Sequence, residues 1–147
     1  CPTNDGVSVC LLMSAKKAKA LGIKPIAKIV AMNVSGIKPQ IMGMGPVIAV
    51  KKALKQAGLT PKDIDLVEFN EAFASQVIAS SRELDIPFNK LNVNGGSLAI
   101  GHPLGATGIR LVGTLAKSLQ FHQKQIGVAT QCIGAGMGIA TIIKACT

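Results

Sequence analysis

The chain has 147 residues, of which 48% are hydrophobic and only 16% are charged, and its formal net charge is +9. This length favours one domain with a sizeable core, and no apolar run approaches the ~18 residues that suggest a membrane span. The positive charge could attract an anionic ligand, although a solvated helix face is the simpler interpretation of any single lysine. Nucleic acid is a poor candidate partner, because the chain has no Trp or Tyr, only four Phe and no recognised reader motif.

The first half of the chain predicts two strands and two helices. An apolar run at 7–13 is typical of a buried strand, and it places Cys10 in the core. Ser14 can cap the helix that follows. A second strand, rich in branched residues, is expected at 26–34. After a loop marked by Gly and Pro, Pro46 sits at the start of a helix whose apolar residues recur at helical spacing while its lysines face away.

The second half continues the alternation. A strand at 65–69 leads directly into a helix at about 71–84, and a short extended piece at 91–93 precedes a pair of glycines. A helix at about 104–121 has an apolar stripe that predicts one buried face. Two final strands, on either side of a glycine-rich turn, are expected at 126–132 and 137–143. The pattern predicts an α/β domain spanning 1–147, with helices on both faces of the sheet.

The cysteines are widely spaced, and none forms a C-x-x-C pair: Cys1, Cys10, Cys132 and Cys146. With only two histidines in the chain, no spacing is sensible for a structural zinc site, so we expect no metal. A disulfide scaffold is unexpected in so apolar a chain, which favours a reducing, intracellular compartment.

Four short blocks place a reactive or hydrogen-bonding side chain beside glycine or other small residues, where backbone can approach a ligand closely. They are Asn70-Glu71-Ala72-Phe73-Ala74, Gly95-Gly96-Ser97, Gly101-His102-Pro103-Leu104-Gly105-Ala106 and Cys132-Ile133-Gly134-Ala135-Gly136. Together they supply an amide, an imidazole, a thiol and backbone N–H groups, which are the groups needed to act on a carbonyl.

Each residue also has a purely structural interpretation. Cys132 could be a core residue at a strand end, and His102 could simply be packed in its Gly-Pro loop. Asn70 is a favoured residue for a helix N-cap, and Phe73 could belong to the core.

In this order and spacing the blocks resemble the C-terminal half of a thiolase, an enzyme that makes or breaks a carbon–carbon bond between acyl-CoA units. The likeness runs along essentially the whole chain, beginning at Asn4-Asp5-Gly6 and continuing through Met42-Gly43-Met44-Gly45-Pro46. It implies a mixed five-stranded sheet covered by helices. It also implies a second half of similar size, absent here, which carries the nucleophilic cysteine and packs on this half through a shared helical layer.

The resemblance implies catalytic roles for four residues. Cys132 would be the acid/base that takes the α-proton of acetyl-CoA or returns it. His102 would activate the nucleophilic cysteine and donate a hydrogen bond to the thioester oxygen. Asn70 would hold a catalytic water that forms an oxyanion hole with the histidine, and the N–H of Gly134 would contribute to a second oxyanion hole.

The resemblance also implies contacts with the acyl chain and the pantetheine arm. Met42, Ala72 and Phe73 match apolar positions that line the tunnel. Cys1 occupies a position near the pantetheine arm where the family usually has a small polar residue, which is a departure from the pattern.

The implied activity is acyl transfer: Claisen condensation of two acetyl-CoA to acetoacetyl-CoA plus CoA, or the reverse thiolysis. Coenzyme A thioesters would be substrates, with no separate cofactor, and the isolated fragment would be inactive without the N-terminal half. The full-length protein would form a homodimer or homotetramer in the cytoplasm or mitochondrion, with no nucleic acid or membrane partner. Two alternatives stay open: a thiolase for longer 3-ketoacyl-CoA, and a non-catalytic module that binds CoA or assembles with a partner.

Overall fold

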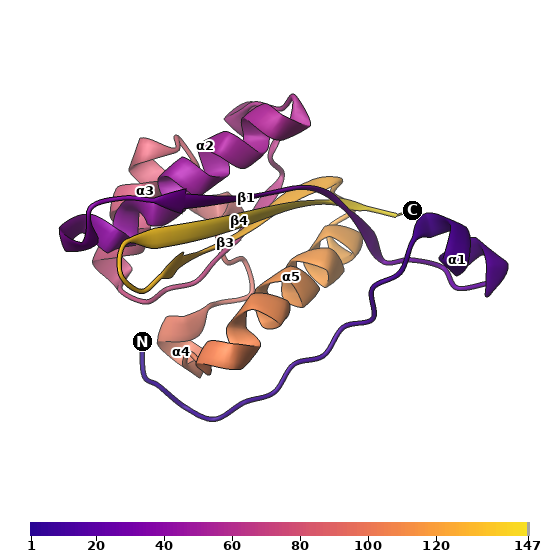
Figure 1. Ribbon diagram of the computed structural model, residues 1–147, viewed down its shortest axis with the longest axis horizontal. Helices are drawn as coiled ribbons and strands as arrows, with labels where there is room; N and C mark the ends of the chain where they lie inside the picture. Colours follow the sequence, from indigo (N-terminus) through magenta and orange to yellow (C-terminus); the bar gives the residue numbers. More distant parts are fainter. Residues whose placement is uncertain (147) are drawn as a thin grey trace.

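The computed structural model describes residues 1–146, which form a mixed sheet of four strands with helices on both faces (Figure 1). The strands are β1 (Ala27–Gly36), β2 (Leu66–Phe69), β3 (Ile126–Ile133) and β4 (Met137–Ala145). Their order across the sheet is β1-β4-β3-β2. The β1–β4 and β3–β4 pairs are antiparallel, whereas β2 pairs with β3 in parallel. The α/β class is confirmed.

The helices of the described residues are α1 (Ala15–Ala20), α2 (Gly45–Ala57), α3 (Ala74–Glu83), α4 (Ser97–Ile100) and α5 (Leu104–Phe121). Short 3-10 turns occur at Pro39–Met44, Pro61–Asp63 and Phe88–Lys90. Helices α2 and α3 lie on one side of the sheet and α5 lies on the other (Figure 1). Within residues 1–146, no helix is both long and apolar enough to cross a membrane.

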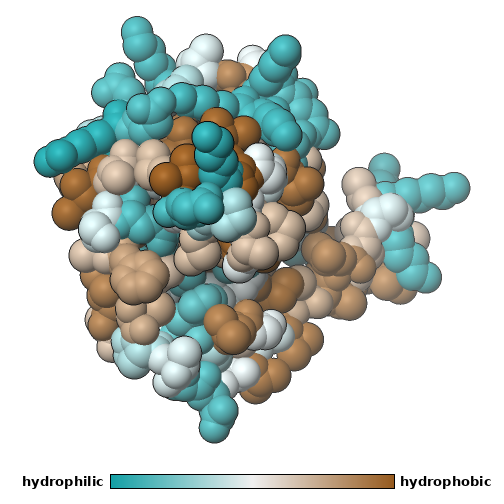
Figure 2. Space-filling view, turned by 60° about the vertical axis from the view of Figure 1, so that its left-hand side comes forward, coloured by the Kyte–Doolittle hydropathy of each residue, from teal (hydrophilic) through white to brown (hydrophobic). Residues whose placement is uncertain are grey.

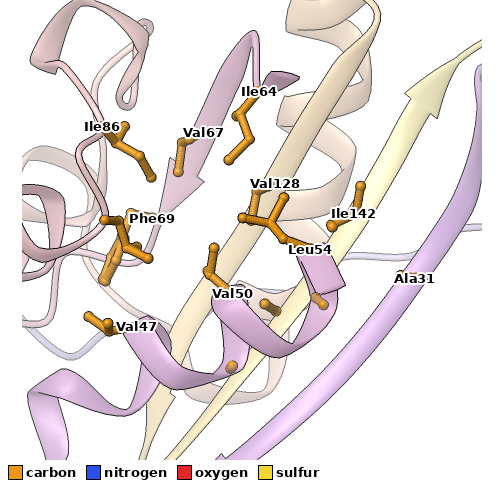
Figure 3. Close-up of a cluster of buried hydrophobic side chains, with 14 of the residues drawn as sticks. Ala31, Val47, Val50, Leu54, Ile64, Val67, Phe69, Ile86, Val128 and Ile142 are labelled. Carbon is orange, nitrogen blue, oxygen red and sulfur yellow. The ribbon is translucent and has the colours of Figure 1, made fainter. Parts of the chain in front are cut away.

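The larger core lies between α2 and the sheet (Figure 3). Val50 and Leu54 of α2 are one helical turn apart and point toward the strands. Phe69 of β2 and Val128 of β3 are almost wholly buried against them. Burying each such side chain contributes roughly 1.5–3 kcal/mol, so this layer fixes the end of β2 from which the following loop departs.

A second core lies on the other face, between α5 and the sheet. Leu111, Leu115 and Leu119 recur every four residues and are almost completely buried. They pack with Ala129, whose neighbour in sequence, Val128, faces the α2 side. This alternation between faces is the period expected of a strand buried on both sides.

The expected strand at 7–13 is wrong, and with it the expectation of a five-stranded sheet. Residues 7–13 are extended but pair with no strand, and Val7 and Val9 are both 88% exposed. The segment instead runs outside α5, where Ser8 Oγ donates to Ala106 O at 2.6 Å (Figure 1). Cys10 is accordingly exposed rather than in the core. An apolar run indicates that burial is favourable, but it does not say which partner supplies it.

Apolar side chains also remain exposed elsewhere. On β1, Met32 and Val34 are about half exposed, and Figure 2 shows hydrophobic areas between hydrophilic side chains on one face of the molecule. The expectation that such surface is buried against another half stays a prediction.

Several of the predicted helix and strand boundaries agree with the structure, and others do not. Helix α5 has the predicted ends, and Ser14 Oγ accepts from Lys17 N at 3.2 Å as the predicted N-cap. The helix expected from residue 71 begins only at Ala74, because residues 70–73 form a loop. The extended piece at 91–93 forms only an isolated bridge between Leu91 and Val67.

The start of α2 lies against the start of β4 with no room for a side chain between them. A Cβ added to Gly45 would lie 2.5 Å from the carbonyl oxygen of Met137. The same approach holds Ser35, whose Oγ donates to Gly45 O at 2.7 Å. Neither backbone can move without loosening the α2 layer.

We therefore expect Gly45→Ala to lower the free energy of unfolding by about 2 kcal/mol or more, because it overpacks a backbone contact. The matched control is Gly113→Ala on α5, where an added Cβ meets no atom within 4 Å. That variant should gain up to about 1 kcal/mol from helix propensity. Urea unfolding of the protein measures both, and equal stabilities of the two variants would contradict the predicted contact.

Candidate functional site

All four predicted blocks have residues toward one end of the sheet. Asn70 directly follows β2, and its N–H donates to Thr130 O of β3 at 2.9 Å. Cys132 lies two residues further along β3. With ~3.3 Å per residue and ~4.8 Å between strands, the backbones of Asn70 and Cys132 are within about 8 Å. Carboxyl ends of parallel strands are a common location for ligand sites in α/β sheets.

Asn70 and His102 are in contact. The Asn70 side chain is completely buried, and its Nδ2 lies 3.4 Å from Nε2 of His102. Ser97 Oγ donates to Oδ1 of the same carboxamide at 2.6 Å. The N-cap interpretation of Asn70 is wrong, because helix α3 begins four residues later with Phe73 as its N-cap.

The far side of the imidazole is held by Thr107. His102 Nδ1 lies 2.7 Å from Thr107 Oγ1, and Thr107 Oγ1 donates to Pro103 O at 3.0 Å. A hydroxyl has one proton, so Thr107 must accept from His102, and Nδ1 carries the hydrogen. In the neutral ring, Nε2 is then the nitrogen with the lone pair.

The neutral ring is favoured by its surroundings. Burial lowers the pKa of His102 below its usual value, and the positive charge of Arg110 lowers it further. Near neutral pH the ring therefore holds a proton on Nδ1 and can accept one at Nε2.

The loop after β2 is braced by contacts that the sequence did not suggest. Glu71 accepts from Asn92 Nδ2 at 2.6 Å and from Leu98 N at 3.0 Å. Asn92 also bridges the backbone of Phe69, with contacts of 2.7 Å to its N–H and 2.9 Å to its carbonyl. The Glu71 carboxylate occupies the space beside Gly96, where a Cβ would collide with it. In the sequence, only the position of Glu71 next to Asn70 could have indicated these contacts.

The N-terminal segment covers the loop that carries His102. The His102 N–H donates to Pro2 O at 2.9 Å, and the nitrogen of Cys1 donates to Ala72 O at 2.8 Å. Asn4 Nδ2 lies 3.5 Å from Ile100 O. Residues near positions 1–4 and 100–102, far apart in the sequence, are thus neighbours in space.

Cys132 and Gly134 lie in the β3–β4 hairpin. Cys132 is partly exposed and pairs with Gly138 of β4. A Cβ at Gly134 would meet no atom within 4 Å, and among residues 1–146 no hydrogen bond uses the Gly134 N–H. Within residues 1–146, no hydrogen bond joins Cys132 or Gly134 to Asn70 or His102. The structure therefore brings the two pairs together by their location at the sheet end and not by direct contact.

The four residues predicted to bind the acyl chain or pantetheine arm differ in their location and exposure. Cys1 and Ala72 are hydrogen-bonded to each other through the backbone. Phe73 is 60% exposed, so its interpretation as a core residue is wrong. Met42 lies partly exposed in the 3-10 turn before α2. Contacts of these four side chains with an acyl chain or a pantetheine arm stay a prediction.

The side chains that bind metals in proteins do not converge in the described part of the chain. Among residues 1–146, no group of three His, Cys, Asp or Glu is placed to hold a metal ion. The four cysteines are all free thiols.

A buried acid lies on β2 behind the site. Glu68 is only 1% exposed, and its Oε2 has no hydrogen-bond partner among residues 1–146. Burial raises its pKa to about 7, and the negative charge of Glu71 adds to this, while Arg110 acts in the opposite direction.

Glu68 should make stability depend on pH. Between pH 4.5 and about 7 the unfolded carboxyl loses its proton while the folded one keeps it, so the free energy of unfolding falls as pH rises through this window. The expected loss is on the order of 3 kcal/mol. It should disappear in Glu68→Gln but remain in the control Glu83→Gln, whose carboxylate forms an exposed pair with Lys51. Urea unfolding at about pH 5 and about pH 8 measures it, and an unchanged pH dependence in Glu68→Gln would contradict the assignment.

Comparison with known proteins gives consistent matches along the chain. Residues 23–145 match the family described as Thiolase, C-terminal domain. A 3-ketoacyl-CoA thiolase of Marinomonas is 53% identical over 144 residues, covering 96% of this chain and 37% of that relative. An acetyl-CoA acetyltransferase of Chromobacterium violaceum is 50% identical over 141 residues, again covering 96% of this chain and 36% of the relative.

Solved structures give the same result for the fold. Human mitochondrial 3-ketoacyl-CoA thiolase superposes with a TM-score of 0.89 at 48% identity, covering 91% of this chain and 34% of that structure. The Bacillus anthracis acetyl-CoA acetyltransferase gives a TM-score of 0.88 at 44% identity, covering 90% and 34%. The chain thus spans little more than a third of the length of the relatives it matches.

Proposed function

Because the chain belongs to the thiolase family, matching its C-terminal domain, we propose that it is the C-terminal catalytic half of an acyltransferase acting on coenzyme A thioesters. The proposed reaction is Claisen condensation of two acetyl-CoA to acetoacetyl-CoA plus CoA, or the reverse thiolysis. The observation that carries the proposal is the contact between the Asn70 carboxamide and the neutral imidazole of His102, at the sheet end that also bears Cys132.

His102 has the protonation state that activation of a thiol requires. Its Nε2 can accept the proton of the nucleophilic cysteine of the other half, and the ring then becomes a donor toward the thioester oxygen. Thr107 keeps Nδ1 protonated throughout, so proton exchange is confined to Nε2.

Asn70 is proposed to hold a water beside His102. The buried carboxamide is fixed at Oδ1 by Ser97, so its Nδ2 is oriented toward the space next to Nε2. A water held there would join His102 in stabilising negative charge on the thioester oxygen, an interaction that typically lowers a barrier by on the order of 3 kcal/mol per donor.

Cys132 and Gly134 are proposed to act on the second acetyl-CoA. The Cys132 thiolate would take the α-proton, and the resulting enolate carbon would attack the thioester carbonyl of the acylated cysteine in the other half. The new carbon–carbon bond would form as the carbon–sulfur bond breaks, and the nucleophilic cysteine would leave as its thiolate. The uncommitted N–H of Gly134 would stabilise charge on the carbonyl oxygen. Met42, Ala72, Phe73 and Cys1 would line the acyl and pantetheine tunnel.

We also propose a reducing intracellular compartment, cytoplasm or mitochondrion, and a homodimer or homotetramer of the full-length protein. The free thiols support the compartment, as does the similarity to a human mitochondrial enzyme.

A longer-chain 3-ketoacyl-CoA thiolase is the second candidate, because several relatives at about 50% identity are named 3-ketoacyl-CoA thiolase. The two candidates are separated by comparing kcat/KM for thiolysis of acetoacetyl-CoA and of a long-chain 3-ketoacyl-CoA. Preference for acetoacetyl-CoA supports the first candidate, preference for the long chain supports the second, and no turnover of either by the full-length protein supports a non-catalytic module.

Replacing Cys132 by Ala should lower condensation in the full-length protein by on the order of 10²–10⁴-fold, because proton abstraction from acetyl-CoA is lost. Acylation of the nucleophilic cysteine should be largely kept, which mass spectrometry of the protein after mixing with acetyl-CoA measures. The control is Cys10→Ala, an exposed thiol outside the site. Condensation at the wild-type rate in Cys132→Ala would refute its role.

A further inference from the structure

A continuous chain of hydrogen bonds runs through the candidate site and connects α4, α5 and the two loops. Its members follow one another in the order Arg110, Ser97, Asn70, His102, Thr107 and Pro103.

The two ends of this chain have fixed roles. A guanidinium can only donate, so Arg110 Nη2, at 2.9 Å from Ser97 Oγ, makes the hydroxyl an acceptor. A carbonyl can only accept, so the Pro103 oxygen at the other end takes the proton of Thr107. Because the donor at one end and the acceptor at the other are fixed, each group between them accepts from the preceding member and donates to the next.

This direction determines how the Asn70 carboxamide is turned. Because Ser97 accepts from Arg110, its own proton goes to Asn70 Oδ1 at 2.6 Å. The amide nitrogen is then left to face His102 Nε2. An Asn side chain has two orientations that differ only by exchange of O and N, and Ser97 selects one of them.

We propose that Ser97, anchored by Arg110, is a positioning residue that sets the orientation of the Asn70 carboxamide and thereby keeps His102 in the form with its lone pair at Nε2. The proposal rests on the proposed function for its meaning in catalysis, although the bonding itself does not depend on any substrate.

Burial makes this hydroxyl hard to replace. Ser97, Asn70 and Thr107 each have 0% exposure, so bulk water has no ready access to a partner that loses its bond. Alanine at position 97 would leave Asn70 Oδ1 and Arg110 Nη2 without their present partners, and a buried group without a partner is costly. Rotation of the carboxamide by 180° relieves part of this cost, because Oδ1 can then accept from His102.

The rotated carboxamide would favour the protonated form of the imidazole over the neutral form. With Oδ1 facing Nε2 and Thr107 facing Nδ1, both ring nitrogens have an acceptor, which is the arrangement that stabilises the protonated ring. Loss of the Ser97 hydroxyl should therefore raise the pKa of His102. The positive charge of Arg110, which acts on the ring, is unchanged by this substitution.

The test is the pH titration of His102 by ¹⁵N NMR of the imidazole in the resting protein, which reports both the pKa and which nitrogen carries the proton. In Ser97→Ala the pKa should rise by about half a pH unit or more, and the Nδ1–H form should lose its dominance. Ser97→Thr, which keeps the hydroxyl, should restore the wild-type values. Ser97→Cys keeps the volume with a weaker donor and should give an intermediate shift, also serving if the Ala variant does not fold.

The matched control is Ser81→Ala, which removes a buried serine hydroxyl that bonds to Ile86 O, outside this chain of bonds. It should leave the His102 titration unchanged. An unaltered His102 pKa and proton position in folded Ser97→Ala and Ser97→Cys would overturn the proposal, as would an equal shift in Ser81→Ala.

Turnover then distinguishes this proposal from the proposed function. In an active full-length protein, the acidic limb of the kcat/KM profile should move to higher pH in Ser97→Ala by the same amount as the NMR pKa. If the protein has no thiolase activity but the NMR shift is present, the proposed function fails and the positioning role stands.

Discussion

Residues Leu66–Phe69 pair in parallel with Gly127–Thr130, and this short pairing determines where the chemistry-bearing side chains lie. All four residues of β2 are buried, so a shift of one residue in register would turn the strand's core side chains to the wrong face. The register brings the end of β2 beside the end of β3. Asn70 and Cys132, more than sixty residues apart in sequence, become neighbours for that reason alone.

Helix α5 links the core to the imidazole. Its buried stripe begins with Thr107 and continues at four-residue intervals through Leu111, Leu115 and Leu119. The leucines pack on the sheet, while Thr107 holds His102. The ring is therefore positioned by the same packing that stabilises the domain, and a change deep in the α5 core would also move the site.

Much of the architecture could be predicted from local patterns. The period of apolar residues gave the ends of α5, and Ser14 marked the start of α1, because these signals depend on neighbours along the chain. The strand predicted at 7–13 does not form, because apolar character indicates burial without identifying a partner. The five-stranded sheet was implied by the resemblance, whereas the sheet of residues 1–146 has four strands.

The site was predictable only where local sequence motifs identify its residues. The motif blocks named the carboxamide and the imidazole that the fold brings into contact. The brace formed by Glu71 with Asn92, and the contact of Arg110 with Ser97, join elements that meet only after the chain has folded. No local spacing encodes such pairs.

The β3–β4 hairpin is tied to the segment that follows β1. Ile37 N donates to Gly136 O at 2.7 Å, and Gly136, with a φ of +87°, leaves no room for a Cβ beside Ile37 and Pro39. Connecting segments usually accept insertions and deletions readily. This one is expected to keep its length across evolution, because an added or missing residue between β1 and α2 would displace the glycine turn and with it the amide of Gly134.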